Sequence, residues 1–263
     1  MKKYLALILI MILTITLSGC KKKIVEKTKS PARPVENINQ LAVVDRPFVT
    51  LTPRTDGHEL TLTIDEVKNA ANVDYEIEYY DSQRTYIEGA VGHIDFSQEV
   101  PPVSKKILLG TCSKNVCRYR DEGVSGGSLT LRFAGGDNSY TLKSDFNLQV
   151  MADRQGIFIT NDAKATLDVG KTGLASSTFV TVASTMGLPG AVEGQILAGP
   201  YAFLAPTSPA LSKATITIKS KEDLTTAKLL FWTGKAWKEL ISTLAEGQIS
   251  APATSLGTFI VVK

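Results

Sequence analysis

The run Gly123-Val-Ser-Gly-Gly127 places a serine between two glycines at the spacing used by acyl-transfer enzymes. That chemistry needs a strand before the serine, a helix after it, and a histidine later in the chain to accept the serine proton. Here an alternating strand pattern begins at Ser128, and both histidines, His58 and His93, precede Ser125. We therefore predict a turn at Ser125, with the two histidines on the surface.

Other residues that could carry chemistry lack the context that the chemistry needs. The pair Asp121-Glu122 could serve a glycosidase, but such pairs are common on solvated turns. The run Val169–Thr172 matches the end of a phosphate-binding loop, yet position 165, where the first glycine should stand, is alanine. Gly136–Asn138 and Asn161-Asp162 offer oxygen ligands for calcium without a full loop signature. The sequence predicts no catalytic residues, no metal site and no cofactor.

Three aromatic residues are candidate ligand-binding residues. Trp232 and Trp237 flank a predicted hairpin turn at Gly234, and Tyr80 follows a predicted strand. Exposed aromatic rings can stack on sugar rings or fill a partner's pocket. The alternative, which the sequence favours, is that these rings close the ends of the β-structure.

The chain has three cysteines, and two of them lie close together. Cys112 and Cys117 would close a short loop in an oxidising compartment, which contributes about 2 kcal/mol in the chain-entropy model. Zinc would need two further ligands, and only His58 and His93 could supply histidine nitrogens. We predict a Cys112–Cys117 disulfide, with free thiols as the alternative.

The third cysteine, Cys20, ends an export signal. Lys2 and Lys3 precede an apolar stretch over residues 4–17, which as a helix would span about 21 Å and fall short of a bilayer core of roughly 30 Å. The stretch Leu17-Ser-Gly-Cys20 resembles the lipobox of bacterial lipoproteins. The resemblance implies that residues 1–19 are removed and that the Cys20 thiol carries a diacylglyceryl group. An uncleaved membrane helix and a plain secretory signal are the alternatives.

Residues 20–45 are expected to form a flexible basic tether after the lipidated cysteine. They are rich in lysine and contain Pro31 and Pro34, without a helical or strand period. Of the formal charge of +3, Lys2 and Lys3 supply two and residues 21–44 a net four, so the remainder has a net charge of −3. A mildly acidic folded part argues against nucleic-acid binding, which normally uses a basic patch.

Residues 46–150 are expected to form an antiparallel β-sandwich. Leu60, Leu62 and Ile64 alternate with polar residues, which is the period of a half-buried strand. The pattern predicts strands at 58–65, 73–79, 106–109, 116–119, 128–133, 140–142 and 146–150, with turns at 69–72, 89–92, 123–127 and 135–138. Asn72–Tyr80 resembles the central strand of fibronectin type III modules, which implies an immunoglobulin-like sandwich. A different all-β topology is the alternative.

Residues 151–263 are expected to form a second sandwich, with the junction at 151–155. The pattern predicts strands at 156–160, 165–169, 178–183, 195–204, 214–219, 227–232, 236–241, 248–251 and 258–262, and at most a helical turn near 220–226. Gly199–Phe203, Thr215–Lys219 and Leu229–Leu240 resemble the sandwich domain shared by zonula-occludens proteins, netrin receptors and bacterial surface proteins. The resemblance implies a non-catalytic contact module.

These observations predict an all-β, lipid-anchored protein on the outer face of a bacterial membrane. Its expected partners are the membrane, through the lipid, and a surface protein or a glycan. The leading hypothesis is a non-catalytic role in contacts or envelope architecture. The alternatives are a glycan or solute receptor that uses Trp232, Trp237 or Tyr80, and, third, an envelope hydrolase.

Overall fold

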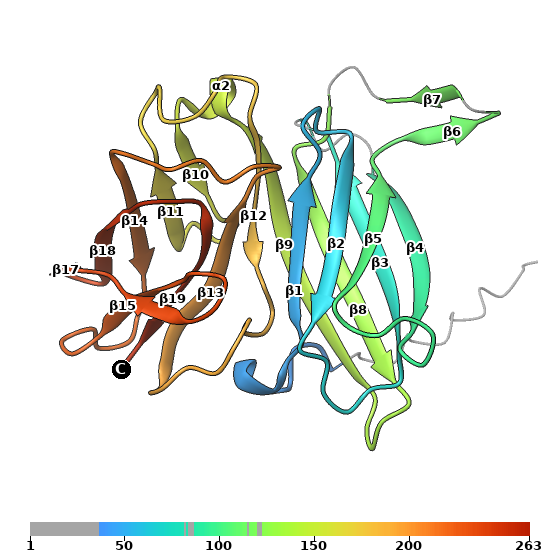
Figure 1. Cartoon of the computed structure of the whole chain (residues 1–263), viewed down its shortest axis with the longest axis horizontal. Coiled ribbons are helices and arrows are strands. Elements are labelled where there is room, and N and C mark those ends of the chain that lie inside the picture. The colour runs from blue at the N-terminus through green and yellow to red at the C-terminus, as the bar shows by residue number, and fades with distance from the viewer. Residues whose placement is uncertain (1–36, 82, 84–86, 115, 120–122) are drawn as a thin grey trace, which may run out of the picture. The chain divides into compact units, whose positions relative to one another are not determined.

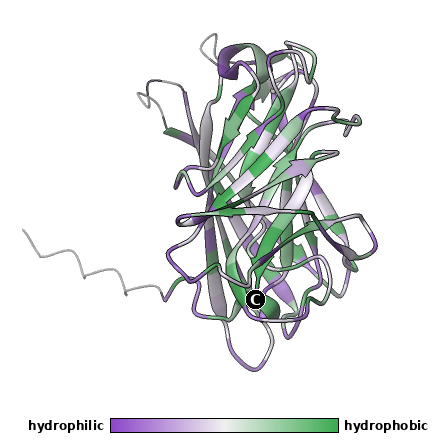
Figure 2. Ribbon diagram, turned by 90° about the vertical axis from the view of Figure 1, so that its left-hand side faces the viewer, coloured by the Kyte–Doolittle hydropathy of each residue, from purple (hydrophilic) through white to green (hydrophobic). Residues whose placement is uncertain are grey.

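A computed structural model describes residues 37–81, 83, 87–114, 116–119 and 123–263. The described chain is all-β and its sheets are antiparallel, which confirms the predicted fold class. Figure 2 shows hydrophobic residues along the strands and more hydrophilic residues in the loops. This distribution is expected when each sheet buries one face.

One sheet runs through both halves of the described chain (Figure 1). Its nine strands stand in the order β16 (Trp237–Glu239), β15 (Lys228–Trp232), β19 (Gly257–Val262), β13 (Ile196–Leu204), β12 (Phe179–Ser184), β9 (Tyr140–Val150), β8 (Gly126–Ala134), β3 (Asn72–Tyr80) and β4 (Ile87–Asp95). The halves join where β9 pairs with β12, from Val150 opposite Phe179 to Phe146 opposite Ala183. The ranges 46–150 and 151–263 therefore share a continuous ladder of backbone hydrogen bonds.

A three-stranded sheet covers one end of this large sheet. It contains β1 (Phe48–Pro53), β2 (Glu59–Asp65) and β5 (Val103–Leu108) in that order. Leu60, Leu62 and Ile64 are fully buried, as their alternation predicts, and they pack in one cluster with Ile77, Leu131 and Phe146 of the large sheet. The two layers therefore form the first sandwich.

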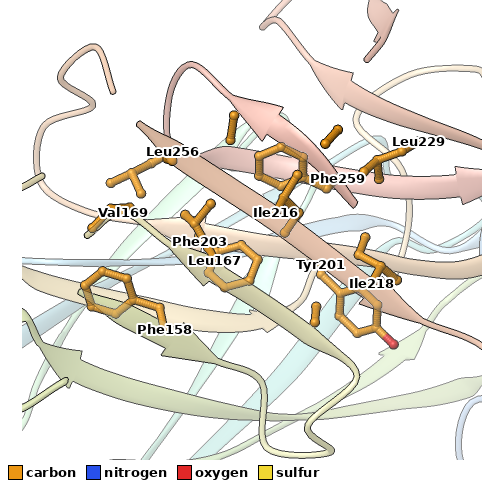
Figure 3. Close-up of a cluster of buried hydrophobic side chains, with 14 of the residues drawn as sticks. Phe158, Leu167, Val169, Tyr201, Phe203, Ile216, Ile218, Leu229, Leu256 and Phe259 are labelled. Atoms are coloured by element: carbon orange, nitrogen blue, oxygen red, sulfur yellow. The ribbon is translucent and has the colours of Figure 1, made fainter. Parts of the chain in front are cut away.

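A five-stranded sheet covers the other end. It contains β10 (Ile157–Ile159), β11 (Ala165–Asp168), β14 (Ala214–Lys219), β18 (Gln248–Ala253) and β17 (Thr243–Ala245). Figure 3 shows the core that these strands enclose with the large sheet. Phe158, Phe203, Ile216 and Phe259 are fully buried in this core, and the edge-to-face pair Phe203–Phe259 has ring centroids 6.2 Å apart.

The predicted turn at 89–92 is wrong, because these residues lie in the middle of β4. That strand pairs with β3 without interruption from Asp95 opposite Asn72 to Ile87 opposite Tyr80. Gly92 faces Tyr75, and a Cβ on Gly92 would lie 2.2 Å from the tyrosine ring. Gly92 therefore stands in the strand because its missing side chain leaves room for the Tyr75 ring of the neighbouring strand.

The other differences are a merged strand, strands that the sequence did not indicate, and the position of a helical turn. The segments predicted at 140–142 and 146–150 form the single strand β9, and the sequence did not indicate β1, β17 or β6 (Thr111–Ser113) as strands. No helix forms at 220–226, whereas a one-turn helix, α2 (Met151–Arg154), occupies the predicted junction. The helical turn is consistent with the burial of Met151, whose side chain packs in the core between the five-stranded sheet and the large sheet.

The last part of the range expected as a tether lies on the folded body. Asn39 donates from its amide to the Lys143 carbonyl at 2.9 Å and accepts from the Lys143 N–H at 3.0 Å. A short 3-10 helix, η2 (Val43–Asp45), then leads to β1. Cys20 and residues 21–36 lie outside the described residues.

Candidate functional site

The two tryptophans lie directly opposite each other in the hairpin of β15 and β16. Trp232 pairs with Trp237, and the Thr233 N–H donates to the Ala236 carbonyl at 3.0 Å to close the turn. Gly234 has φ +88°, a conformation that favours glycine. The predicted hairpin and its turn position are confirmed.

The tryptophan rings are held by the loop that follows β12. Their centroids are 5.3 Å apart at an interplanar angle of 61°, an edge-to-face arrangement. Trp237 Nε1 donates to the Gly190 carbonyl at 3.1 Å, and a Cβ on Gly190 would lie 2.7 Å from Trp232 Cη2. Both rings are half-buried, so each keeps surface that a ligand can contact.

The rings line an open groove of about 490 Å³, which we call the tryptophan groove. Its floor is apolar and includes the buried side chains of Leu230 and Val262. Its remaining lining comes from Gly190, Ala191, Val192, Glu193, Lys228, Lys235, Ala236 and Glu239. The volume falls within the range of about 300–1,000 Å³ that is usual for small-molecule sites.

Strand alternation explains why an apolar floor lies here. Leu229 and Val261 point into the core beneath the five-stranded sheet, so their neighbours Leu230, Ile260 and Val262 point to the opposite face. There they form a separate small cluster with Leu188, against which Trp237 packs. The groove is therefore built on the outer face of the large sheet.

The polar rim of the groove carries both charges. Lys228 Nζ lies 3.0 Å from Glu239 Oε2, and both side chains are more than half exposed. An exposed ion pair of this kind adds little to stability. Its donors and acceptors can therefore turn to a polar ligand at small cost in free energy. Apolar ring faces beside hydrogen-bonding groups suit a ligand with both kinds of surface, such as a sugar.

Tyr80 lies elsewhere in the sheet. Six strand spacings separate β15 from β3, or about 29 Å at the usual distance of about 4.8 Å between strands. Tyr80 borders a pocket of about 10 Å³ together with Tyr79, Asp81 and Leu109. The structure thus brings Trp232 and Trp237 into one site and leaves Tyr80 outside it.

Ser125 and the two histidines make separate contacts in the structure. The Ser125 hydroxyl donates to the Asp81 carbonyl at 2.9 Å, and strand β8, not a helix, begins at the next residue. His93 is exposed within β4, as predicted for the surface, with Nδ1 2.6 Å from Asp74 Oδ1. His58 stacks on Tyr119 with centroids 3.9 Å apart. None of these contacts joins a histidine to the serine.

The predicted disulfide between Cys112 and Cys117 is confirmed. The sulfurs are 1.99 Å apart, and the two cysteines face each other in a two-stranded ribbon, β6 (Thr111–Ser113) with β7 (Val116–Arg118). All six described strand positions of the ribbon are exposed. The bridge is therefore local to one hairpin.

Sequence reasoning missed the residues that complete the tryptophan groove. Leu230 and Val262 read as ordinary strand residues, and the pairing of β15 with β19 that unites them is set by the tertiary fold. The one available signal was Gly187-Leu-Pro-Gly190, which indicates a turn but not the strand against which it packs.

Comparison with protein-family models finds no match for this chain, and comparison with curated proteins finds none either. Within the described part of the chain, no helix has the length and apolar character to cross a bilayer. The described residues also contain no cluster of three or more histidine, cysteine, aspartate or glutamate side chains placed to share a metal ion.

Proposed function

We propose that this protein is a lipid-anchored, non-catalytic binding protein on the outer face of a bacterial membrane, and that its tryptophan groove binds glycans. The observation that carries the glycan assignment is the opposed pair Trp232–Trp237 over an apolar floor, with the exposed Lys228–Glu239 pair at the rim. Sugar rings present an apolar face and peripheral hydroxyls, and the groove offers a partner for each.

Two features support the anchored location. The Leu17–Cys20 stretch resembles a lipobox, and Lys21, Lys22 and Lys23 follow at once. Two acyl chains hold a protein at a membrane for long times, and basic residues next to an anionic surface add about 1 kcal/mol each. The Cys112–Cys117 disulfide is compatible with an oxidising compartment outside the cytoplasm.

Glycan binding is tested with the full chain purified in detergent and applied to an array of cell-wall and surface glycans. We expect saturable binding that falls at least tenfold in Trp232→Ala and Trp237→Ala. Tyr119→Ala is the matched control, since Tyr119 is also half-buried but stacks on His58 in the other half of the chain. An array without binding, or equal losses in all three variants, would contradict the assignment.

The anchor is tested separately by labelling cells with radioactive palmitate. We expect label in the wild-type protein and none in Cys20→Ala. Because this readout does not involve the groove, a failure here rejects the anchor and leaves the glycan assignment standing.

A further inference from the structure

A second hollow, of about 260 Å³, lies where the two halves of the large sheet meet, and we call it the polar cleft. Segments far apart in the sequence contribute to it: the chain before β1, strand β9, the turn between β10 and β11, the end of β12 with the residues after it, and β13. Its charged and hydrogen-bonding lining includes Arg46, Lys143, Asp145, Asn161, Asp162 and Tyr201.

Arg46 and Lys143 supply the positive charge of the cleft, and neither forms an ion pair with a described carboxylate. Arg46 donates from Nε to the Leu41 carbonyl and from Nη2 to the Asn39 carbonyl, both at 2.8 Å, so the guanidinium is fixed in place. Burial lowers the pKa of Arg46. Among the described residues, no carboxylate lies within 4 Å of either cation. Donors that remain on a fixed guanidinium suit a carboxylate or another planar anion.

Asp145 and Asp162 supply the negative charge of the same cleft. Asp145 Oδ2 accepts from the Asn161 amide at 3.3 Å, and Asp162 Oδ1 accepts from the Thr160 hydroxyl at 2.7 Å. Asp162 Oδ2 also lies 3.7 Å from Nζ of Lys164, whose side chain is more than half exposed. The nearly buried Tyr201 completes this side. Burial raises its pKa, and the charge of Asp162 and a hydrogen bond to it act in the same direction. In Figure 3 the Tyr201 hydroxyl points away from the labelled core side chains.

The wall of the cleft contains a strained residue. Met186 has φ +64°, which is rare for a side chain of its size. Its conformation is enforced by hydrogen bonds on both sides, from its own N–H to the Ser184 hydroxyl at 3.2 Å and from the Thr185 hydroxyl to the Gly187 carbonyl at 2.7 Å. Strain that the surroundings enforce is concentrated at ligand-binding sites.

We propose that the polar cleft binds a small zwitterionic ligand of the amino-acid class, with its carboxylate on Arg46 and Lys143 and its ammonium group on Asp145 and Asp162. The volume of the cleft, about 260 Å³, is below the range of about 300–1,000 Å³ for drug-sized ligands, so the ligand should be small. The two carboxylates would repel a simple anion, whereas a ligand with both charges can place its carboxylate beside the cations and its ammonium group beside the carboxylates. This site is separate from the tryptophan groove and does not depend on the glycan assignment.

The test uses the full chain in detergent and isothermal titration with each of the twenty common amino acids. We expect at least one to bind saturably, and its N-acetyl and C-amide derivatives to bind at least tenfold more weakly, since each derivative lacks one charge. Lys143→Gln and Asp145→Asn should each weaken binding at least tenfold. Arg46 is not varied, because it holds the chain before β1 in place.

The controls are Lys171→Gln and Asp153→Asn, which make the same charge changes at exposed positions outside the cleft, and Trp232→Ala, which alters the other site. All three should bind the amino acid as the wild type does. The proposal is overturned if no amino acid binds, if the N-acetyl derivative binds as tightly as its parent, or if the cleft variants match the controls while circular dichroism shows them folded.

Discussion

Trp237 donates its indole N–H to the carbonyl oxygen of Gly190 at 3.1 Å, which ties the edge of the large sheet to the loop after β12. The same glycine lies against the ring of Trp232, where a Cβ would come within 2.7 Å of Cη2. One residue without a side chain therefore sets the positions of both rings. The groove therefore depends on a loop residue that lies 47 positions before Trp237 in the sequence.

Gly190→Ala should damage the tryptophan groove because the added methyl group must displace the Trp232 ring or the loop. We expect glycan affinity to fall about tenfold, equivalent to about 1.4 kcal/mol. Intrinsic tryptophan fluorescence should change with it. Gly170→Ala is the control: its φ of +71° makes alanine cost about 1 kcal/mol of stability, but nothing lies within 4 Å of the new Cβ and Gly170 does not line the groove. Equal glycan affinities for Gly190→Ala and the wild type would show that the loop does not determine the positions of the tryptophan rings.

Gly92→Ala should lower the free energy of unfolding by about 1–3 kcal/mol, as overpacking does, because its Cβ would overlap the Tyr75 ring. The measurement is urea denaturation followed by circular dichroism. The double-mutant cycle with Tyr75→Ala isolates the overlap, since Gly92→Ala should cost much less once the ring is removed. An equal cost in both backgrounds would attribute the effect to β4 itself.

Local periodicity was enough to predict most strands of this fold. Ala214–Lys219 alternates cleanly, and β14 has the predicted bounds. The alternation of Leu60, Leu62 and Ile64 with polar residues puts all three on one face of their strand, and all three are buried. The wrong turn at 89–92 has a different origin, because glycine is typical of turns, whereas Gly92 lies in a strand opposite the ring of Tyr75 on the neighbouring strand.

The sites were less predictable than the strands because they join distant segments. The two tryptophans could be found from their hairpin, but the floor at Leu230 and Val262 depends on the pairing of β15 with β19. The polar cleft brings Arg46, Lys143 and Asp162 together across the β9–β12 junction. No spacing in the sequence encodes that junction, since β9 and β12 are separated by the strands β10 and β11 of another sheet.

Reducing the Cys112–Cys117 bridge should lower the free energy of unfolding by at most about 2 kcal/mol, because it closes a short loop. Glycan binding should not change, since the exposed ribbon belongs to the half that lacks the tryptophan groove. Urea denaturation with and without reductant gives the first quantity, and the Cys112→Ser/Cys117→Ser variant controls for the reductant. A loss above about 4 kcal/mol would mean that the ribbon supports the wider fold.

Tyr140 should make the protein sensitive to alkali. Burial raises its pKa from 10.0 to about 12, and its hydroxyl donates to the Lys68 carbonyl at 3.3 Å beside the stacked ring of Phe133. Between pH 10 and pH 12 the unfolded chain releases this proton while the folded chain keeps it. The contribution of the protonated Tyr140 phenol to the free energy of unfolding is therefore complete below pH 10 and is lost as the pH rises through about 12.

Tyr140→Phe should reduce the fall in stability over that alkaline interval, measured by urea denaturation at a series of pH values. At pH 7 the variant should be less stable by about 1 kcal/mol for the lost hydrogen bond, and this offset should shrink as the pH rises. Burial also raises the pKa of Tyr201, so the Tyr140→Phe/Tyr201→Phe variant should show a still smaller alkaline loss. If Tyr140→Phe and wild type lose stability in parallel from pH 10 to 12, the phenol of Tyr140 is not protected by burial.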